Sequence, residues 1–136
     1  MSNEPKTGGR YVEVPREAII GRLEKAGFVR EERSGEVTYS RRHDRDDRLK
    51  VIVYTSIAEN AATGRGCGED AIRVVALFSW TRRDETEPRR KKLYTGRVFR
   101  VTSVDGVLDR MMERARDAYA ACNDWLKEQA TQRGQR

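Results

Sequence analysis

Long apolar runs are missing from this sequence. No stretch approaches the roughly 18 apolar residues of a membrane-spanning helix, and the opening MSNEPKTGGR lacks the apolar core of a signal peptide. Cysteine is scarce as well, because Cys67 and Cys122 are too few for a disulfide framework. Cys122 also falls on an apolar helical stripe. These absences predict a soluble protein with reduced thiols, and we expect it in the cytoplasm with no membrane partner.

Histidine occurs once, as His43, and the familiar active-site motifs are missing. A Cys–His nucleophilic pair would need His43 beside Cys67, and nothing in the sequence brings the two together. Asp44, Asp46 and Asp47 follow His43 as potential metal ligands, but the arginines between them neutralise their charge, which favours a structural turn. There is no P-loop, paired CxxC, HExxH or Gly-x-Ser-x-Gly motif. We therefore expect no catalytic residue, no metal and no cofactor.

Apolar residues are nevertheless arranged in periodic blocks, although 37% of the 136 residues are charged and the mean hydropathy is −0.85. Disordered chains lack such blocks, so we expect one folded domain over residues 10–128. The segments 1–9 and 129–136 are polar, without periodicity, and are predicted to be flexible tails.

Two helices and four strands are predicted from these blocks. Pro15 begins a short helix that Gly27 ends, since proline is tolerated in the first turn and glycine favours the C-terminus. Residues 104–128 carry apolar side chains at alternating spacings of three and four, the strongest helical pattern in the chain. Thr102-Ser103 is predicted to cap this helix. The predicted strands cover residues 36–42, 49–57, 71–81 and 93–101.

The predicted fold class is α+β, with the order (β)αββββα. Loops between the strands are too short for crossover helices, so the sheet should be antiparallel, with the helices on one face. It would have four strands, or five if the alternating segment 11–14 contributes one. In element order this is similar to the double-stranded-RNA-binding domain and to the whirly and Pur-type repeats. That resemblance covers element order alone, with no shared residue motif.

The positive charge is unevenly distributed. The chain has a net charge of +6 and an isoelectric point near 9.6. Residues 1–103 carry 22 basic and 16 acidic groups, whereas the helix 104–128 carries four basic and six acidic groups. Excess charge on the sheet and its loops predicts an electropositive side, which is typical of proteins that bind a phosphate backbone.

A basic hairpin is predicted around Pro88. Its acidic residues gather at the tip, while Trp80 and Tyr94 flank it as rings on which unpaired bases could stack. Charge runs are also commonly solvated loops, and that alternative stays open. The basic residues of this hairpin are Arg82, Arg83, Arg89, Arg90, Lys91 and Lys92.

Strand alternation predicts a second cluster on one sheet face. The residues expected to share it are Lys50, Tyr54, Arg73, Tyr94 and Arg100, a plausible stacking platform for single strands. Ile52, Val75, Leu77 and Val98 fall on the same alternating sets. The face could instead pack against a second subunit, and a homo-oligomer is the alternative.

A glycine-rich loop runs from Gly64 to Gly68 and contains Arg65. Consecutive backbone N–H groups in such a loop can bind an anion, with Arg65 adding charge. The sequence favours the simpler interpretation, a loop that needs glycine for its backbone conformation.

Three functions remain compatible with these patterns. The favoured hypothesis is a sequence-tolerant nucleic-acid-binding module that prefers single-stranded DNA or RNA. The alternatives are a protein-assembly module with solvated basic loops, and an enzyme that holds a phosphate-bearing substrate at the Gly64–Gly68 loop. The predicted nucleic-acid contacts are Lys50, Tyr54, Arg65, Arg73, Trp80, Arg82, Arg83, Arg89, Arg90, Lys91, Lys92, Tyr94 and Arg100.

Overall fold

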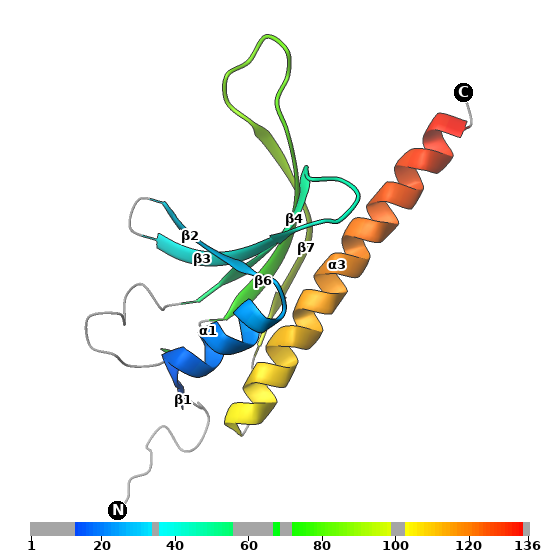
Figure 1. Ribbon diagram of the computed structural model, residues 1–136. Helices are drawn as coiled ribbons and strands as arrows, with labels where there is room; N and C mark the ends of the chain where they lie inside the picture. The colour runs from blue at the N-terminus through cyan, green and yellow to red at the C-terminus, as the bar shows by residue number, and fades with distance from the viewer. Residues whose placement is uncertain (1–12, 34–35, 56–66, 69–71, 99–102, 135–136) are drawn as a thin grey trace, which may run out of the picture.

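A computed structural model describes residues 13–33, 36–55, 67–68, 72–98 and 103–134 (Figure 1). It confirms the α+β class, an antiparallel sheet with a long helix at the C-terminal end. In chain order the elements are β1 (Glu13–Val14), α1 (Arg16–Lys25), β2 (Val29–Arg33), β3 (Glu36–Arg42), β4 (Leu49–Tyr54), β5 (Cys67–Gly68), β6 (Arg73–Trp80), β7 (Arg89–Arg97) and α3 (Val104–Gly134).

The main sheet has five strands in the order β2-β3-β4-β6-β7, and every neighbouring pair is antiparallel. The fifth strand is β2, not the segment 11–14. Residues of that segment form β1, which pairs with β5 in a separate two-stranded sheet. β2 has the sequence VREER, and this charged edge strand lacks the apolar alternation that would have revealed it.

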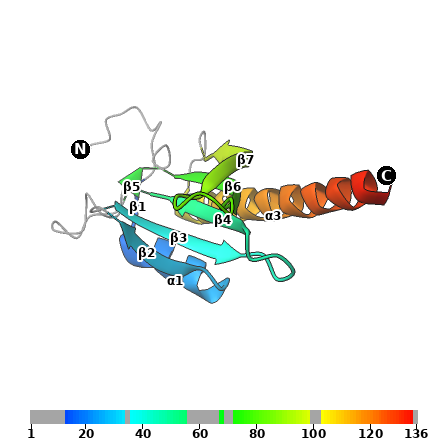
Figure 2. The ribbon, with the colours of Figure 1, turned by 90° about the horizontal axis from the view of Figure 1, so that it is seen from above.

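Both helices lie on one face of the main sheet (Figures 1 and 2). Pro15 precedes the first residue of α1, and Gly27 follows its end with φ of +91°, a conformation that glycine adopts without strain. Ile19 and Leu23 of α1 are fully buried. They join the core between the helices and the inward side chains of β3, β4 and β6, among them Tyr39, Val53 and Val74.

The long helix α3 packs mainly on β6 and β7 and then continues beyond the sheet (Figure 2). Its first turn is capped by Ser103, whose Oγ accepts a hydrogen bond of 3.0 Å from the Gly106 N–H. The predicted stripe is buried at Leu108, Met111 and Cys122. The helix ends at Gly134, six residues later than predicted, because 129–134 contain good helix formers such as Gln129 and Ala130 without any apolar pattern.

The hairpin of β6 and β7 is longer than the sequence predicted. β7 begins at Arg89, so the four basic residues 89–92 belong to a strand and not to the loop. Ala76 pairs with Tyr94 and Leu77 with Lys92, which leaves Leu93 as the extra residue of a β-bulge. Because side chains alternate along a strand, this bulge reverses which residues of β7 face the helices.

Neither helix of the described residues combines the length and the apolar character needed to cross a membrane.

Candidate nucleic-acid interface

The sheet face opposite the helices carries two cross-strand rows of basic and aromatic side chains. In one row Tyr54 of β4 pairs with Arg73 of β6, which pairs with Arg97 of β7. In the other, Arg42, Lys50, Leu77 and Lys92 are successive partners across β3, β4, β6 and β7. Arg90 lies two residues beyond Lys92 on β7, opposite Ser79. We call this surface the outer face.

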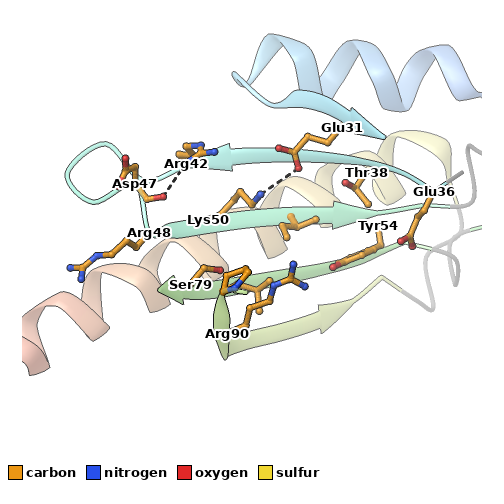
Figure 3. A pocket seen from close by; sticks show the side chains of 13 residues that line it. Glu31, Glu36, Thr38, Arg42, Asp47, Arg48, Lys50, Tyr54, Ser79 and Arg90 are labelled. Carbon is orange, nitrogen blue, oxygen red and sulfur yellow. Dashed lines mark hydrogen bonds and ion pairs between the residues drawn. The ribbon is translucent and has the colours of Figure 1, made fainter. Parts of the chain in front are cut away.

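A groove of about 280 Å³ is formed on the outer face (Figure 3). Figure 3 shows Lys50 and Tyr54 of β4 on the side of the sheet away from the helices, with Arg90 on β7, beyond β6. The residues that line the groove are Glu31, Glu36, Thr38, Arg42, Asp47, Arg48, Lys50, Ile52, Tyr54, Leu77, Ser79, Pro88 and Arg90.

Positive charge predominates on the outer face. Among the side chains that the structure describes, the strand register places six basic ones there, Arg42, Lys50, Arg73, Arg90, Lys92 and Arg97, against the acidic Glu31 and Glu36. Glu31 forms an ion pair with Lys50, with 3.4 Å between carboxylate oxygen and Nζ. Within the described part of the chain, the side chains of Arg90, Lys92 and Arg97 have no ion pair or hydrogen bond. These three cations are available to an anionic ligand.

Tyr54 is the aromatic ring of this face. Its side chain is half-buried, and the guanidinium carbon of Arg73 lies 4.6 Å from the ring centroid. A guanidinium at this distance is attracted by the π-system and holds the ring in position. The pair therefore offers a fixed aromatic plane next to a positive charge, the combination on which an unpaired base and its phosphate bind.

Apolar residues of the outer face are largely covered within the single chain. Ile52 is 7% exposed and Val75 is 3% exposed, so neither offers much area to a second subunit. The exception is Val29 on the edge strand β2, which the register with Ser40 puts on this face and which, at 64%, is the only large hydrophobic residue among the described ones that is mostly exposed. The apolar strip thus forms the floor of a charged groove.

The basic hairpin is divided between the two sides of the sheet. Arg90 and Lys92 lie on the outer face, while Arg89 and Lys91 point to the helix side. Arg89 binds Glu85 through two hydrogen bonds of 2.9 and 2.6 Å, and this guanidinium lowers the pKa of the Glu85 carboxyl. Nζ of Lys91 lies 5.2 Å from the centroid of the Trp125 ring. Only half of the basic run 89–92 therefore lies on the outer face.

Arg82 and Arg83 occupy the hairpin loop and are exposed. The Glu85 N–H donates a hydrogen bond of 3.0 Å to the Arg82 carbonyl, which closes the turn at this end of the loop. The side chains of Arg82 and Arg83 have no ion pair with any described residue. Both can contact an anion that extends past the groove along the hairpin.

Tyr94 does not lie on the outer face, and this prediction is wrong. It pairs with the inward-facing Ala76 and packs against α3, above Gly96, where an added Cβ would collide with the Tyr94 hydroxyl. Burial and the nearby Asp117 carboxylate raise the pKa of Tyr94, and Arg114 opposes them. Val98, expected on the same outer set, is fully buried in the core. The alternation in the sequence correctly predicted that Tyr94, Gly96 and Val98 share one face of β7, but that face is the helix side and not the outer face.

Trp80 lies at the base of the hairpin and stacks on Phe78, with 5.4 Å between ring centroids. Phe78 is held in turn by the Trp125 ring at 5.2 Å and by the Arg48 guanidinium at 5.0 Å. Trp80 remains half-buried. Trp80 pairs with Arg89 and belongs to the same alternating set as Phe78, so it lies on the helix side of the sheet, opposite to Tyr54.

His43 belongs to a polar cluster that joins the 43–48 turn to α3. Its Nδ1 accepts the Arg45 backbone N–H at 3.1 Å, so Nε2 carries the proton and donates it to Asn123 Oδ1 at 2.7 Å. The ring also stacks on Tyr119, with centroids 4.7 Å apart. Both ring nitrogens are thus engaged, and no group of three or more potential metal ligands occurs among the described residues. The cluster serves to dock the turn on the helix.

Two of the predicted contacts, Arg65 and Arg100, lie outside the described residues, as do Gly64 and Gly66 of the glycine-rich loop. Cys67 and Gly68 form β5 opposite Val14 and Glu13.

The sequence did not predict Arg42 and Arg48 as residues of the groove, nor Arg97 as a residue of the outer face. Arg42 lies on the same alternating set as Thr38 and Ser40. If the 43–48 turn is taken as the loop of a hairpin between β3 and β4, Arg42 falls opposite Lys50. Arg48 is held by Asp46 through contacts of 2.9 and 2.8 Å, and this hydrogen-bonded pairing lowers the pKa of the Asp46 carboxyl. Arg97 lies within the range assigned to the last strand, but its face follows from the register and not from the sequence.

No protein-family model matches the chain, and neither a curated protein nor a solved structure is significantly similar to it.

Proposed function

We propose that the outer face of the five-stranded sheet binds single-stranded nucleic acid with little sequence preference. The observation that carries this proposal is a set of three cations along β7, Arg90, Lys92 and Arg97, which have no partner among the described residues and lie on the same face as the Tyr54–Arg73 pair. Cations supply affinity for the phosphate backbone, and an aromatic plane supplies stacking that every base can use. In a reduced cytoplasm both DNA and RNA would be available ligands.

Single strands suit this face better than a duplex does. A base can stack on Tyr54 only if it is unpaired, and the groove lies on the face of a sheet, with no helix on it that could enter a duplex groove. Cationic contacts to phosphate carry no base information, so binding should tolerate most sequences.

Self-association through the same face was the alternative. The low exposure of Ile52 and Val75 leaves Val29, on the edge strand β2, as the main apolar area that this face offers to a second copy. Net positive charge on both partners would also oppose face-to-face pairing of identical chains. These observations favour a polyanion as the ligand.

The hairpin provides a matched pair of variants for the test. Arg90→Ala/Lys92→Ala removes one arginine and one lysine from the outer face, whereas Arg89→Ala/Lys91→Ala removes the same residue types from the helix side of the same strand. Fluorescence anisotropy with labelled DNA and RNA single strands, at two salt concentrations, gives the affinities. Circular dichroism checks that both variants are folded.

We expect the outer pair to weaken binding of all sequences alike and to flatten the plot of log affinity against log salt by about 0.7 for each lost phosphate contact. The helix-side pair should change affinity much less. Equal losses for the two pairs would contradict the assignment of the face. Absence of binding by the parent protein below about 100 μM at low salt, the weak limit of ordinary non-specific binding, would overturn the function.

A further inference from the structure

A second groove lies between the end of α1 and the middle of α3, on the face of the sheet that both helices cover (Figure 1). It has a volume of about 310 Å³ and shares no lining residue with the groove of the outer face. Alternation along β3 turns Arg41 toward the helices and Arg42 away from them, so the two grooves lie on opposite sides of the sheet. We call this second hollow the helix-side groove.

The walls of the helix-side groove are mostly apolar. Phe28 and Val51 are buried beneath it, while Ala26, Met112 and Tyr119 are half-buried and leave part of their surface to it. A volume of about 310 Å³ is equal to that of roughly ten water molecules of ~30 Å³ each. The groove therefore has room for a small ligand of about ten non-hydrogen atoms with an apolar body, near the lower size limit of small-molecule sites.

The polar residues of this groove offer hydrogen-bond donors. Arg116 is exposed and has no ion pair or hydrogen bond with any described residue. Asn123 Oδ1 accepts hydrogen bonds from His43 Nε2 at 2.7 Å and from the Arg45 guanidinium at 3.3 Å. The NH₂ group of Asn123 is left without a partner among the described residues. A ligand with a hydrogen-bond acceptor would satisfy both side chains.

The charge of the groove favours an acceptor with a single negative charge. The Arg41 guanidinium donates to the Ala26 carbonyl at 3.3 Å and lies 3.9 Å from the Asp44 carboxylate, which offsets its charge. Arg116 lacks such a carboxylate, so these residues together carry one net positive charge. A carboxylate matches that charge at neutral pH and accepts two parallel hydrogen bonds from a guanidinium, whereas a phosphate ester carries nearly two charges.

We propose that the helix-side groove binds a small organic acid, whose carboxylate pairs with Arg116 and whose apolar body lies against Met112 and Tyr119. This site is separate from the outer face, and the proposal does not depend on nucleic-acid binding.

Phenylpropionate is a suitable probe, because it joins one carboxylate to an apolar body of the right size. The amide NMR signals of the isotope-labelled full chain would be followed during a titration to about 20 mM, since the usual binding energy per atom gives a ligand of this size a dissociation constant on the order of 1 mM. We expect the signals of Phe28, Ala120 and Asn123 to shift. Those of Tyr54 and Lys92 on the outer face should not move.

Related compounds test the two halves of the ligand separately. Phenylpropanol keeps the apolar body without the charge and should bind about tenfold more weakly, because it lacks the charge-assisted hydrogen bonds. Acetate keeps the carboxylate without the body and should cause little shift. The cation phenylpropylamine should cause none.

Two arginines of α3 provide matched variants. Arg116→Gln should weaken phenylpropionate binding by about tenfold and leave phenylpropanol binding unchanged. Arg110 is also exposed, but it pairs with Glu113 at 3.5 Å and does not line the groove. Arg110→Gln removes the same charge from the same helix and should change the affinity by less than about twofold, since solvent screens distant charges.

The outcomes decide the proposal. Equal affinity for phenylpropionate and phenylpropanol, or equal losses in the two arginine variants, would show that Arg116 recognises no carboxylate. Shifts confined to the outer face would place the ligand elsewhere. If a hexaglutamate peptide shifts the groove signals and phenylpropionate does not, the groove takes an acidic partner segment and the small-acid site is wrong. Absence of any shift up to the final concentration would overturn the proposal as well, whether or not the outer face binds oligonucleotides.

Discussion

Lys91 holds its Nζ atom 5.2 Å from the centre of the Trp125 ring, and so connects the basic hairpin to the long helix. Such a contact contributes about 0.5–1 kcal/mol at a partly exposed site. We therefore expect Lys91→Ala to lower the free energy of unfolding by that amount in urea denaturation and to leave oligonucleotide affinity within about twofold.

The neighbouring lysine serves as the control. Lys92→Ala removes the same kind of side chain from the outer face, where the Lys92 ammonium group forms no ion pair or hydrogen bond with any described residue. It should weaken oligonucleotide binding with little effect on stability. A variant pair with the opposite pattern would show that the two faces of β7 have been assigned the wrong way round.

The core beneath α3 should be sensitive to truncation. Leu108 is 5% exposed and packs in the cluster between α3 and the sheet. Leu108→Ala is expected to cost about 2–5 kcal/mol, since it removes buried methyl groups and leaves a cavity. Urea titration followed by circular dichroism measures this loss. Lys127→Ala, an exposed change on the same helix, should shift stability by less than about 0.5 kcal/mol.

The hydrogen bond between His43 and Asn123 should contribute to the stability of the fold. His43 is buried, and its Nε2 proton has Asn123 Oδ1 as its partner at 2.7 Å. Asn123→Ala leaves that N–H without its acceptor and should cost about 1–3 kcal/mol. Thermal unfolding reports the change, with Gln129→Ala on the same helix as the control. Equal melting temperatures for the two variants would contradict the docking role of the cluster.

Burial raises the pKa of the Cys122 thiol to about 11, from 9.0 in its unperturbed form. The unfolded chain therefore loses this proton first as the pH rises, and stability should fall between pH 9.0 and about 11 on this account. Below pH 9.0 the thiol is protonated in both states and contributes no pH dependence. Above pH 10 the buried Tyr39 and the half-buried Tyr94, whose pKa values are also raised, should add to the loss.

Urea titrations at pH 8.5 and 9.8 in a Cys67→Ser background test this behaviour, with Cys122→Ala expected to lose most of the dependence. Cys67→Ser alone should leave oligonucleotide binding within a few-fold of the parent. Rapid labelling of Cys122 by iodoacetamide in the folded protein at pH 8 would disagree with a buried, protonated thiol.

The sequence predicted most of the fold because its strongest signals are local. Pro15 and Gly27 bound α1, and the three-four spacing gives the buried stripe of α3. The edge strand β2 was missed because an edge with one wet face needs few apolar residues. The end of α3 was missed because helix propensity, and not burial, carries its last residues.

The candidate site was predicted less completely. Lys50, Tyr54 and Arg73 were placed on one face correctly, since β4 and β6 alternate without interruption where they pair. Tyr94 was misplaced and Arg97 missed because faces on β7 depend on its register with β6, a tertiary property. The run of four basic residues at 89–92 does not predict that Arg89 binds Glu85 or that Lys91 contacts Trp125.

Leu93, the extra residue of the bulge, reverses the alternation of side chains between the two faces of β7. From Tyr94 onward the odd-numbered residues Thr95 and Arg97 lie on the outer face, whereas before Leu93 the even-numbered Arg90 and Lys92 do. Strand alternation divides the four adjacent basic residues into two pairs, and the bulge decides which pair shares a face with Arg97 and is free for a ligand and which fastens the hairpin to Glu85 and Trp125. If Leu93 instead took a regular place in the strand pairing, the net charge would be unchanged, but Arg89 and Lys91, instead of Arg90 and Lys92, would lie on the same face as Arg97.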